Sequence, residues 1–339
     1  MKAAVLFGPG DLRVTDFPVP PMGEDCVKVA VAYCGVCGTD FHKYQGKGGS
    51  RPVKYPVPLG HEISGVVVET GAKVTDFKPG DRVTVDPNWS CGHCWFCQNG
   101  KRHFCENSRG VVKGMAEFIC PPQENVYHIP DSLSLKDAAL TEPLGCCLHG
   151  MDQLDVKLGD TVAIIGLGAI GQLMLQLCAH SAAANIIVVE TVEEKRQRAM
   201  QMGATLFINP LEQDPVEAIR DAGIHNVDKV MECGGVLATA ETAIRVAGKA
   251  ATVVLFSVAD PNAELKLNLY EAFQKELTIK TSYINPYTTG RAIRLLANGA
   301  IDTSSAISYI LELEELEEEI KSRRYSRLGK VVVRISEEE

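Results

Sequence analysis

The sequence predicts an α/β protein of two domains, one mainly β and one a doubly wound parallel sheet, and three observations support this. The chain has 339 residues, about twice the length of an ordinary domain. Its first part contains short alternating apolar and polar runs between turn signals such as Pro79-Gly80-Asp81, which is typical of antiparallel strands. From about residue 150, buried apolar runs alternate with helical patterns, which is typical of parallel βαβ units.

The second domain begins with a buried strand and a helix, predicted over Thr161–Leu167 and Gly168–His180. The same alternation predicts further strands over Asn185–Glu190, Leu206–Asn209, Val227–Cys233, Ala251–Ser257 and Leu277–Ser282, with helices over Val192–Met202, Pro215–Ala222 and Leu237–Val246. Strands of this length that alternate with helices indicate a parallel sheet covered on both faces.

The pattern after Pro286 predicts a helix over Thr289–Asn298, an acidic helix over Leu313–Lys321 and a strand over Lys330–Ile335. We interpret the last strand as returning to the first domain. The expected division is therefore residues 1–149 with 287–339 for the β domain, including a cysteine-rich lobe at about 88–108, and residues 150–286 for the sheet domain.

Composition excludes several classes of function. The formal net charge is −9, which does not attract nucleic acid. The most apolar stretch, Thr161 to Ala179, is interrupted by glycines and reads as strand, turn and helix rather than as a membrane span. With no secretory signal, the 12 cysteines suggest metal or redox chemistry in a reducing cytoplasm.

A glycine-rich loop joins the first strand and helix of the second domain. Gly166, Gly168 and Gly171 form a GxGxxG pattern, in which they permit a tight turn, a close backbone approach to a pyrophosphate, and close packing of helix on strand. The free N–H groups at the helix start, around Ala169 and Ile170, are suited to bind phosphate. The context of strand, loop and helix makes this a dinucleotide site.

An acidic residue at the end of the next strand indicates which dinucleotide binds. Glu190 lies nineteen residues after Gly171, where a carboxylate accepts hydrogen bonds from ribose hydroxyls and repels a 2′-phosphate. This favours NAD over NADP. Lys195 and Arg196 complicate the choice, because one of them could lie beside the ribose, although solvated charges on the following helix are the stronger interpretation.

A group of four cysteines predicts a structural metal site. Cys91, Cys94, Cys97 and Cys105 have the spacing CxxCxxCx7C, which can close a tetrahedron of thiolates around zinc. An iron–sulfur cluster is the alternative for four cysteines, but nothing else indicates electron transfer.

A second, more dispersed set of residues predicts a catalytic zinc. Cys37, His61 and Glu142 are the first choice as three protein ligands that leave a fourth position for water or substrate. Glu62, directly after His61, is the alternative or exchanging ligand.

These motifs together resemble the zinc-dependent medium-chain alcohol dehydrogenases over essentially the whole chain. The resemblance includes Cys37-Gly38-Thr39-Asp40-x-His42, Gly60-His61-Glu62, the four-cysteine lobe, Gly166–Gly171 and Glu232-Cys233-Gly234-Gly235. It implies a GroES-like catalytic domain interrupted by a Rossmann domain. Thr141-Glu142-Pro143-Leu144 is similar to the branch that contains the sorbitol, butanediol and threonine dehydrogenases.

The resemblance also implies an activity. Two zinc ions per subunit, one catalytic and one structural, and NAD would serve the oxidation of a secondary alcohol, first of all a sorbitol- or L-iditol-like polyol. Thr39 and His42 match the proton-relay positions of the family. Ser282 and Lys43 differ from animal sorbitol dehydrogenases, so L-threonine, 2,3-butanediol and sugar-phosphate polyols remain alternative substrates.

Two further expectations complete this interpretation. A homo-oligomer, a tetramer rather than a dimer, would form through the sheet edge near Leu277–Ser282. The competing class is a non-catalytic nucleotide-binding protein, which predicts broken zinc ligands, whereas all candidate ligands are present.

Overall fold

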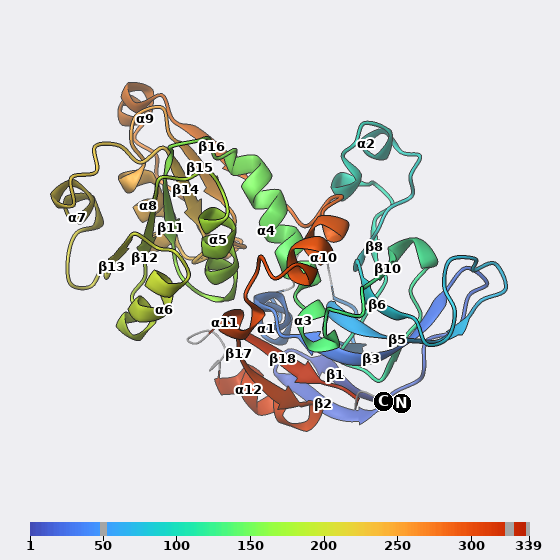
Figure 1. Cartoon of the computed structure of the whole chain (residues 1–339). Helices are drawn as coiled ribbons and strands as arrows, with labels where there is room; N and C mark the ends of the chain where they lie inside the picture. The colour runs from blue at the N-terminus through green and yellow to red at the C-terminus, as the bar shows by residue number, and fades with distance from the viewer. Residues whose placement is uncertain (48–52, 323–328, 337–339) are drawn as a thin grey trace. The chain divides into compact units, whose positions relative to one another are not determined.

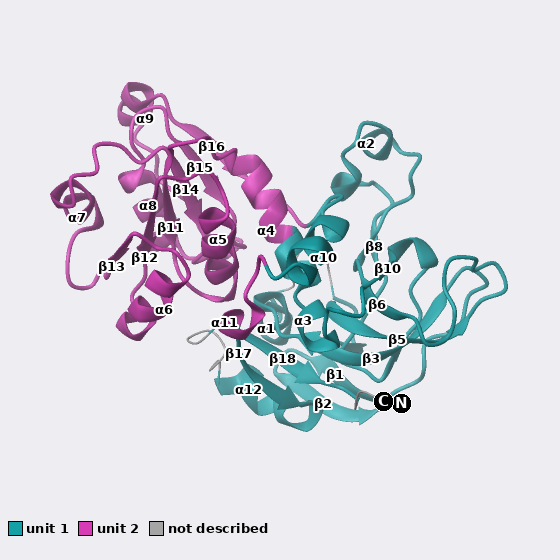
Figure 2. Ribbon diagram, in the orientation of Figure 1, with its two compact units in different colours: residues 1–145, 285–299, 307–339 teal, residues 146–284, 300–306 magenta. Residues whose placement is uncertain are grey.

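The computed structural model describes residues 1–47, 53–322 and 329–336, and it divides into two compact units (Figures 1 and 2). Unit 1 comprises residues 1–145, 285–299 and 307–339, and unit 2 comprises residues 146–284 and 300–306. The expected boundaries differ from these by a few residues, and the return of 300–306 to unit 2 was not predicted. Its cause is local, because the backbone N–H of Asp302 donates to the side chain of Gln176 at 2.7 Å.

Unit 2 contains the predicted parallel sheet, with strand order β13-β12-β11-β14-β15-β16. Its strands are β11 (Thr161–Ile165), β12 (Asn185–Val189), β13 (Leu206–Ile208), β14 (Lys229–Glu232), β15 (Thr252–Leu255) and β16 (Thr278–Thr281). Each neighbouring pair is parallel. The order reverses between β11 and β14, and the crevice at the carboxyl ends of such strands is where open α/β sheets bind ligands.

Helices follow the strands of unit 2 in the expected order (Figure 1). They are α5 (Ala169–Ala179), η3 (Glu193–Lys195), α6 (Arg196–Gln201), α7 (Pro215–Asp221), α8 (Leu237–Val246), α9 (Leu269–Lys275) and α11 (Thr303–Ala306). The start of α7 shows the local reason: the Asp214 side chain accepts from the N–H groups of Val216 and Glu217, and Pro215 occupies the first turn.

Unit 1 is mainly antiparallel β structure in a larger sheet and two smaller ones. The larger sheet has the order β10-β6-β5-β3-β18-β17, with β9 also paired to β3, and the smaller sheets are β2-β1-β4 and β7-β8. The strands are β1 (Lys2–Gly8), β2 (Asp11–Asp16), β3 (Val27–Gly35), β4 (Val57–Pro58), β5 (Glu62–Thr70), β6 (Arg82–Val85), β7 (Asn88–Trp89), β8 (Arg109–Gly110), β9 (Phe118–Ile119), β10 (Val126–His128), β17 (Ile307–Glu312) and β18 (Lys330–Arg334).

The helices of unit 1 are short, apart from those near the boundaries between the units. They are α1 (Gly38–Tyr44), α2 (Trp95–Gln98), η1 (Arg102–Phe104), η2 (Gln123–Asn125), α3 (Leu135–Ala138), α10 (Thr289–Ala297), η4 (Leu313–Glu315) and α12 (Leu316–Ser322), and α4 (Thr141–Leu154) starts in unit 1 and continues into unit 2. None of the described helices is long and apolar enough to cross a membrane.

The prediction that the C-terminal strand returns to the first domain is confirmed. Strand β18 pairs antiparallel with β3, with Val332 opposite Gly35. Strand β17, which was not predicted, lies parallel to β18 at the edge of the same sheet. The buried core of unit 1 therefore combines apolar side chains from both ends of the chain, such as Val31 and Val333.

Candidate functional site

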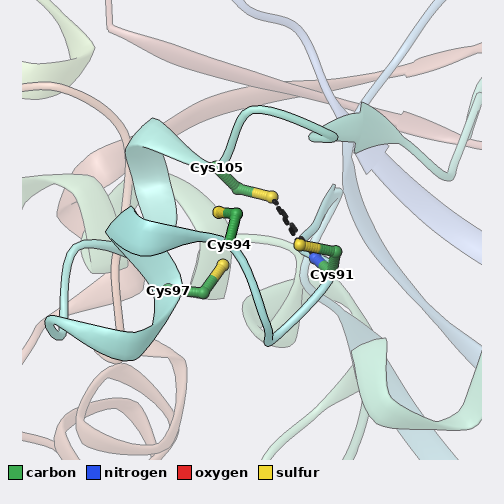
Figure 3. A group of neighbouring side chains, drawn as sticks. All are labelled: Cys91, Cys94, Cys97 and Cys105. Carbon is green, nitrogen blue, oxygen red and sulfur yellow. Dashed lines mark hydrogen bonds between the residues drawn. The ribbon is translucent and has the colours of Figure 1, made fainter.

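Four cysteines converge in the lobe that contains α2 and η1 (Figure 3). Their sulfur atoms, those of Cys91, Cys94, Cys97 and Cys105, lie within 4.8 Å of one another. Cys94 is the N-cap of α2, Cys97 lies within α2, and Cys105 directly follows η1. Four sulfurs gathered in this way fit a tetrahedral zinc ion that has no open position.

Hydrogen bonds prepare this lobe for a metal. The backbone N–H of Cys91 donates to Sγ of Cys105 at 3.3 Å, and the Asn107 side chain donates to Sγ of Cys91 at 3.4 Å. The donation from Asn107, together with the backbone of His93, lowers the pKa of Cys91 to about 5. Since the thiolate is the form that binds metal, the lobe favours the binding form of this residue.

A second group of ligands lies where two strands of unit 1 meet. Strand β3 ends two residues before Cys37, and β5 begins at Glu62, directly after His61. Because Gly35 pairs with Glu62 across these strands, the two loops come together. The ligand atoms of Cys37, His61 and Glu62 lie within 4.8 Å of one another.

Asp40 connects the two loops. Its carboxylate is fully buried and accepts from the backbone N–H of Cys37 at 3.1 Å and from that of Gly60 at 3.2 Å. Its Oδ1 also lies 3.9 Å from Nδ1 of His61. Sequence analysis did not single out this residue, although an acidic residue three positions after a helix N-cap is a recognisable capping signal.

Glu142 belongs to the same neighbourhood. It lies in the first turn of α4 and is 8% exposed. Burial raises the pKa of Glu142 to about 8, a rise that His61 opposes and that Glu62 increases. The charges of His61 and Glu62 therefore act on Glu142. The ligand atoms that lie within 4.8 Å of one another, however, include one from Glu62 and none from Glu142. The sequence ranks Glu142 before Glu62 as the third ligand, and that ranking stays a prediction.

The chemistry of these residues fits a zinc ion. Burial raises the pKa of Cys37 to about 11, and the charge of Glu62 adds to this rise. A cation at this place would favour the charged forms of Cys37 and Glu142 that burial disfavours. Sulfur, imidazole nitrogen and carboxylate oxygen are the donors that zinc prefers. Cys37 and His61, with one or both carboxylates, could therefore hold such an ion.

Lys330, which sequence analysis missed, also lies in this site. It is the first residue of β18 and is 3% exposed. Its ammonium group contacts both carboxylate oxygens of Glu62 and donates to the carbonyl of Val36 at 2.9 Å. Burial alone would lower the pKa of Lys330, but Glu62 and Cys37 raise it.

Thr39 and His42 lie on helix α1, which begins directly after Cys37. Their separation of three residues places them on one face of the helix. Both side chains are half-buried. The predicted relay residues are therefore next to the candidate metal ligands and partly open to solvent.

The three glycines of the loop in unit 2 have different structural roles. Gly166 has φ +93°, a left-handed conformation, and a Cβ on Gly171 would lie 2.1 Å from the carbonyl oxygen of Gly166. A Cβ on Gly168 would meet nothing within 4 Å, so the space beside that residue is open to a ligand. Among the described residues, no side chain caps α5 ahead of Ala169 and Ile170. This arrangement fits a pyrophosphate at the helix start.

The carboxylate of Glu190 contacts this loop. Oε2 accepts from the N–H of Leu167 at 2.7 Å and from Lys195 at 3.3 Å, and Oε1 accepts from the N–H of Val192 at 3.0 Å. Burial would raise the pKa of Glu190, but Lys195 and the backbone donors outweigh it and lower the pKa. Lys195 is 8% exposed, so it lies beside the acidic residue and not on a solvated helix face.

Comparison with known proteins identifies the domains that carry these candidate sites. The alcohol dehydrogenase GroES-like domain matches residues 23–131, and the zinc-binding dehydrogenase domain matches residues 169–298. Sorbitol dehydrogenase of Bacillus subtilis (strain 168) is 33% identical over 94% of this chain and 92% of its own length. D-arabitol-phosphate dehydrogenase of Enterococcus avium is 33% identical over 100% of this chain and 99% of its own length.

A solved structure supports the same assignment. A crystal structure described as a zinc-binding dehydrogenase of Sinorhizobium meliloti 1021, bound to NADP, has a TM-score of 0.92 and 37% sequence identity to this chain. The match covers 98% of this chain and 99% of the other. The chain thus belongs to the zinc-binding medium-chain alcohol dehydrogenase family of oxidoreductases, with its GroES-like and Rossmann-like domains.

Proposed function

We propose that this protein oxidises a secondary alcohol group of a polyol, of the sorbitol or L-iditol type, to a ketone, with zinc at the second site and NAD as hydride acceptor. The observation that carries this proposal is the group of Cys37, His61, Glu62 and Glu142, two half-buried and two buried, which offers zinc a sulfur, a nitrogen and carboxylate oxygens. The similarity to a sorbitol dehydrogenase supports the polyol class.

The side chains of unit 1 can manage the proton of this reaction. A zinc ion held by Cys37, His61 and the carboxylates would supply Lewis acidity at the substrate hydroxyl, and a bound nicotinamide would supply the hydride acceptor. The hydroxyl of Thr39 receives the substrate proton and donates its own onward, and His42, on the same face of α1, is the next acceptor on the way to solvent. Both side chains are partly exposed, as such a relay requires.

A phosphorylated polyol is the second candidate substrate. Lys43 follows His42 directly, and Lys113 precedes Gly114, whose N–H donates to the carbonyl of Gly60 at 3.0 Å. Burial lowers the pKa of Lys113, and the charge of Lys43 adds to the effect. A phosphate would neutralise both, and a relative named D-arabitol-phosphate dehydrogenase favours this reading.

We also propose that the lobe holds a structural zinc and that the protein works in a reducing cytoplasm. In the described part of the chain, which includes all 12 cysteines, none forms a disulfide. Reduced thiols at Cys91, Cys94, Cys97 and Cys105 are the form that a zinc site needs.

A homo-oligomer, a tetramer in preference to a dimer, is proposed through the edge of the unit 2 sheet. Strand β16 ends that sheet, and no described strand pairs with its outer edge. Leu269, Tyr270 and Phe273 on the preceding helix α9 are between 69% and 80% exposed. A strand edge beside exposed apolar side chains is suited to pair with a second copy of the chain.

The substrate class and the cofactor can be tested together. A panel of polyols, diols, polyol phosphates and L-threonine, with NAD or NADP, is followed by the absorbance of the reduced cofactor. NAD should exceed NADP in kcat/KM by roughly tenfold or more, because the carboxylate of Glu190 repels a 2′-phosphate. Two unit charges about 4 Å apart repel by about 4 kcal/mol at an effective dielectric of 20, roughly a thousandfold, and Lys195, 3.3 Å from the carboxylate, offsets part of this.

Two variants test which residues cause the preference for a cofactor and for a substrate. Glu190→Ser should narrow the ratio between the two cofactors, whereas Lys43→Met should raise KM for a polyol phosphate and leave KM for the free polyol nearly unchanged. A native preference for NADP would overturn the assignment of Glu190. Oxidation of none of these alcohols would overturn the proposed function.

Two variants of the proposed catalytic site should separate metal binding from proton transfer. His61→Ala should lose the catalytic metal and turnover while it still binds dinucleotide, because the glycine loop belongs to unit 2. Thr39→Val keeps the side-chain shape but removes the hydroxyl, so metal should remain and kcat should fall by roughly 10²–10⁴. Metal analysis, cofactor titration and initial rates measure the three effects. Full activity of His61→Ala or of metal-stripped protein contradicts zinc-assisted oxidation.

We expect that a variant of the cysteine lobe loses thermal stability without a change in substrate binding. Cys94→Ser should lower the apparent Tm by roughly 5–10 °C, because a structural metal contributes directly to folding. KM of the surviving protein should stay nearly constant. Cys120→Ser, which changes a half-buried cysteine outside the lobe, is the control. A fully active native protein with at most one zinc per subunit would rule out two metal sites.

The exposed edge predicts the oligomeric state. Tyr270→Glu with Phe273→Glu places two charges in the proposed interface and should reduce the mass measured by light scattering. Leu211→Glu, at an exposed residue after the opposite edge strand β13, should leave the mass unchanged. A native particle of 36.7 kDa, or an unchanged mass in the double variant, contradicts this interface.

A further inference from the structure

Asparagine followed by glycine occurs twice in the sequence, as Asn99-Gly100 and Asn298-Gly299. In this dipeptide the backbone nitrogen of glycine can attack the side-chain carbonyl carbon of asparagine, because glycine has no Cβ to hinder the approach. Both pairs end a helix in the same way, with an exposed asparagine as the C-cap and a left-handed glycine after it, at φ +71° and +74°. They differ in what holds each helix in place.

The structure keeps the reacting groups of Asn99 apart. Nδ2 of Asn99 donates to the carbonyl of Trp95 at 2.8 Å, and the backbone N–H of Gly100 donates to the carbonyl of Cys97 at 3.2 Å. Ring closure requires both groups to leave these partners. Helix α2, which supplies both carbonyls, therefore protects Asn99 as long as it is folded.

The fold of helix α2 depends on the cysteines of the lobe. The helix has four residues, none of which is buried, and a helix this short is not stable by itself. Its N-cap is Cys94 and Cys97 lies within it, so a metal bound by the four cysteines ties both ends of α2 to the rest of the lobe (Figure 3). Loss of that metal should unfold the turn that protects Asn99.

Helix α10 provides the contrast. It has nine residues, and three of its apolar side chains are buried in the protein. The backbone N–H groups of Asn298 and Gly299 donate to carbonyls of this helix at 3.1 and 3.2 Å. Because apolar packing holds α10, the surroundings of Asn298 do not depend on a metal in the lobe.

We propose that Asn99 is a modification site that the metal of the lobe protects, and that deamidation of Asn99 after metal loss prevents the metal from binding again. The backbone nitrogen of Gly100 bonds to Cγ of Asn99, and the side-chain nitrogen leaves as ammonia. Water then opens the resulting succinimide ring at one of its two carbonyls, which gives aspartate or isoaspartate without any oxidant or reductant. This inference rests on the structural zinc that we propose for the lobe.

Either product disturbs the metal site. Each places a carboxylate two residues after Cys97 and at the C-terminal end of α2, where negative charge is unfavourable. This carboxylate also lies in the same short lobe as four thiolates that must be brought together. Isoaspartate in addition carries the main chain through its side chain, so it lengthens the segment between Cys97 and Cys105 by one methylene. Metal loss should therefore become irreversible with time.

Peptide mapping by mass spectrometry measures the conversion at both asparagines, and enzymatic methylation of isoaspartate identifies the product. Metal-loaded protein and protein treated with a chelator are incubated at neutral pH, at a temperature at which circular dichroism shows that the metal-free protein is folded. Chelation should speed the conversion of Asn99 by roughly tenfold or more, because an opened segment reacts in proportion to its open fraction. The rate at Asn298 should not change.

Three variants test whether the conversion blocks the metal. After chelation, incubation and return of zinc, Asn99→Gln should regain its lobe metal and its Tm, because glutamine does not close the five-membered ring. The native protein should lose this ability as the incubation lengthens. Asn99→Asp, which supplies one of the products, should bind the lobe metal more weakly from the start. Asn298→Gln is the matched control and should behave as the native protein does.

The outcomes separate this inference from the structural zinc on which it rests. Equal conversion of Asn99 with and without metal, or equal conversion of Asn99 and Asn298 after chelation, overturns the protection by the metal and leaves the zinc site standing. Conversion of Asn99 with full recovery of metal overturns the claim that deamidation prevents binding. Metal analysis of the native protein before incubation tests the zinc site itself, and a lobe without metal would refute that site.

Discussion

The register between β3 and β5 is the constraint on which the candidate metal site depends. Gly35 opposite Glu62 brings the loop of Cys37 beside that of His61. A slip of one residue would turn every side chain of β5 to the other face of the sheet, and Glu62 would lose Lys330. Asp40 fastens the same junction, because its carboxylate accepts from the backbone of both loops. The site therefore follows from strand pairing, and its ligands need no proximity in sequence.

The two metal sites differ in how the chain prepares them. In the lobe, hydrogen bonds within one short segment lower the pKa of Cys91 to about 5. In the second site, burial raises the pKa of Cys37 to about 11 and that of Glu142 to about 8. The lobe thus favours the thiolate of Cys91 without an ion, although burial raises the pKa of Cys97 in the same lobe to about 12. The second site gathers groups whose charged forms depend on a cation, so a bound metal there is strongly coupled to the groups around it.

Sequence predicted the features that are set by local spacing. The four cysteines, the glycine loop and the order of strands and helices in unit 2 depend on neighbours in the chain, and the structure reproduces them. Helix α4 was missed because Pro143 and Gly145 weaken a helical pattern, although proline is compatible with a first turn. Lys330 could not be placed, since its partners Glu62 and Val36 are brought near only by tertiary pairing. Asp40 could be recognised from its bond to Cys37 as a local cap, but its second partner, Gly60, comes from another loop.

Glu190 shows that a sequence motif does not specify all the contacts that its residues make. Its carboxylate already accepts from the N–H groups of Leu167 and Val192 and from the side chains of Thr191 and Lys195. A carboxylate has about four acceptor positions, so ribose hydroxyls that bind here as proposed would have to displace a donor. The side-chain donors, at 3.1 and 3.3 Å, are longer than the bond from Leu167 at 2.7 Å. Ribose would thus displace them, while Glu190 continues to hold the glycine loop. Loss of its carboxylate then loosens the loop for either cofactor, and only the ratio between cofactors reports its charge.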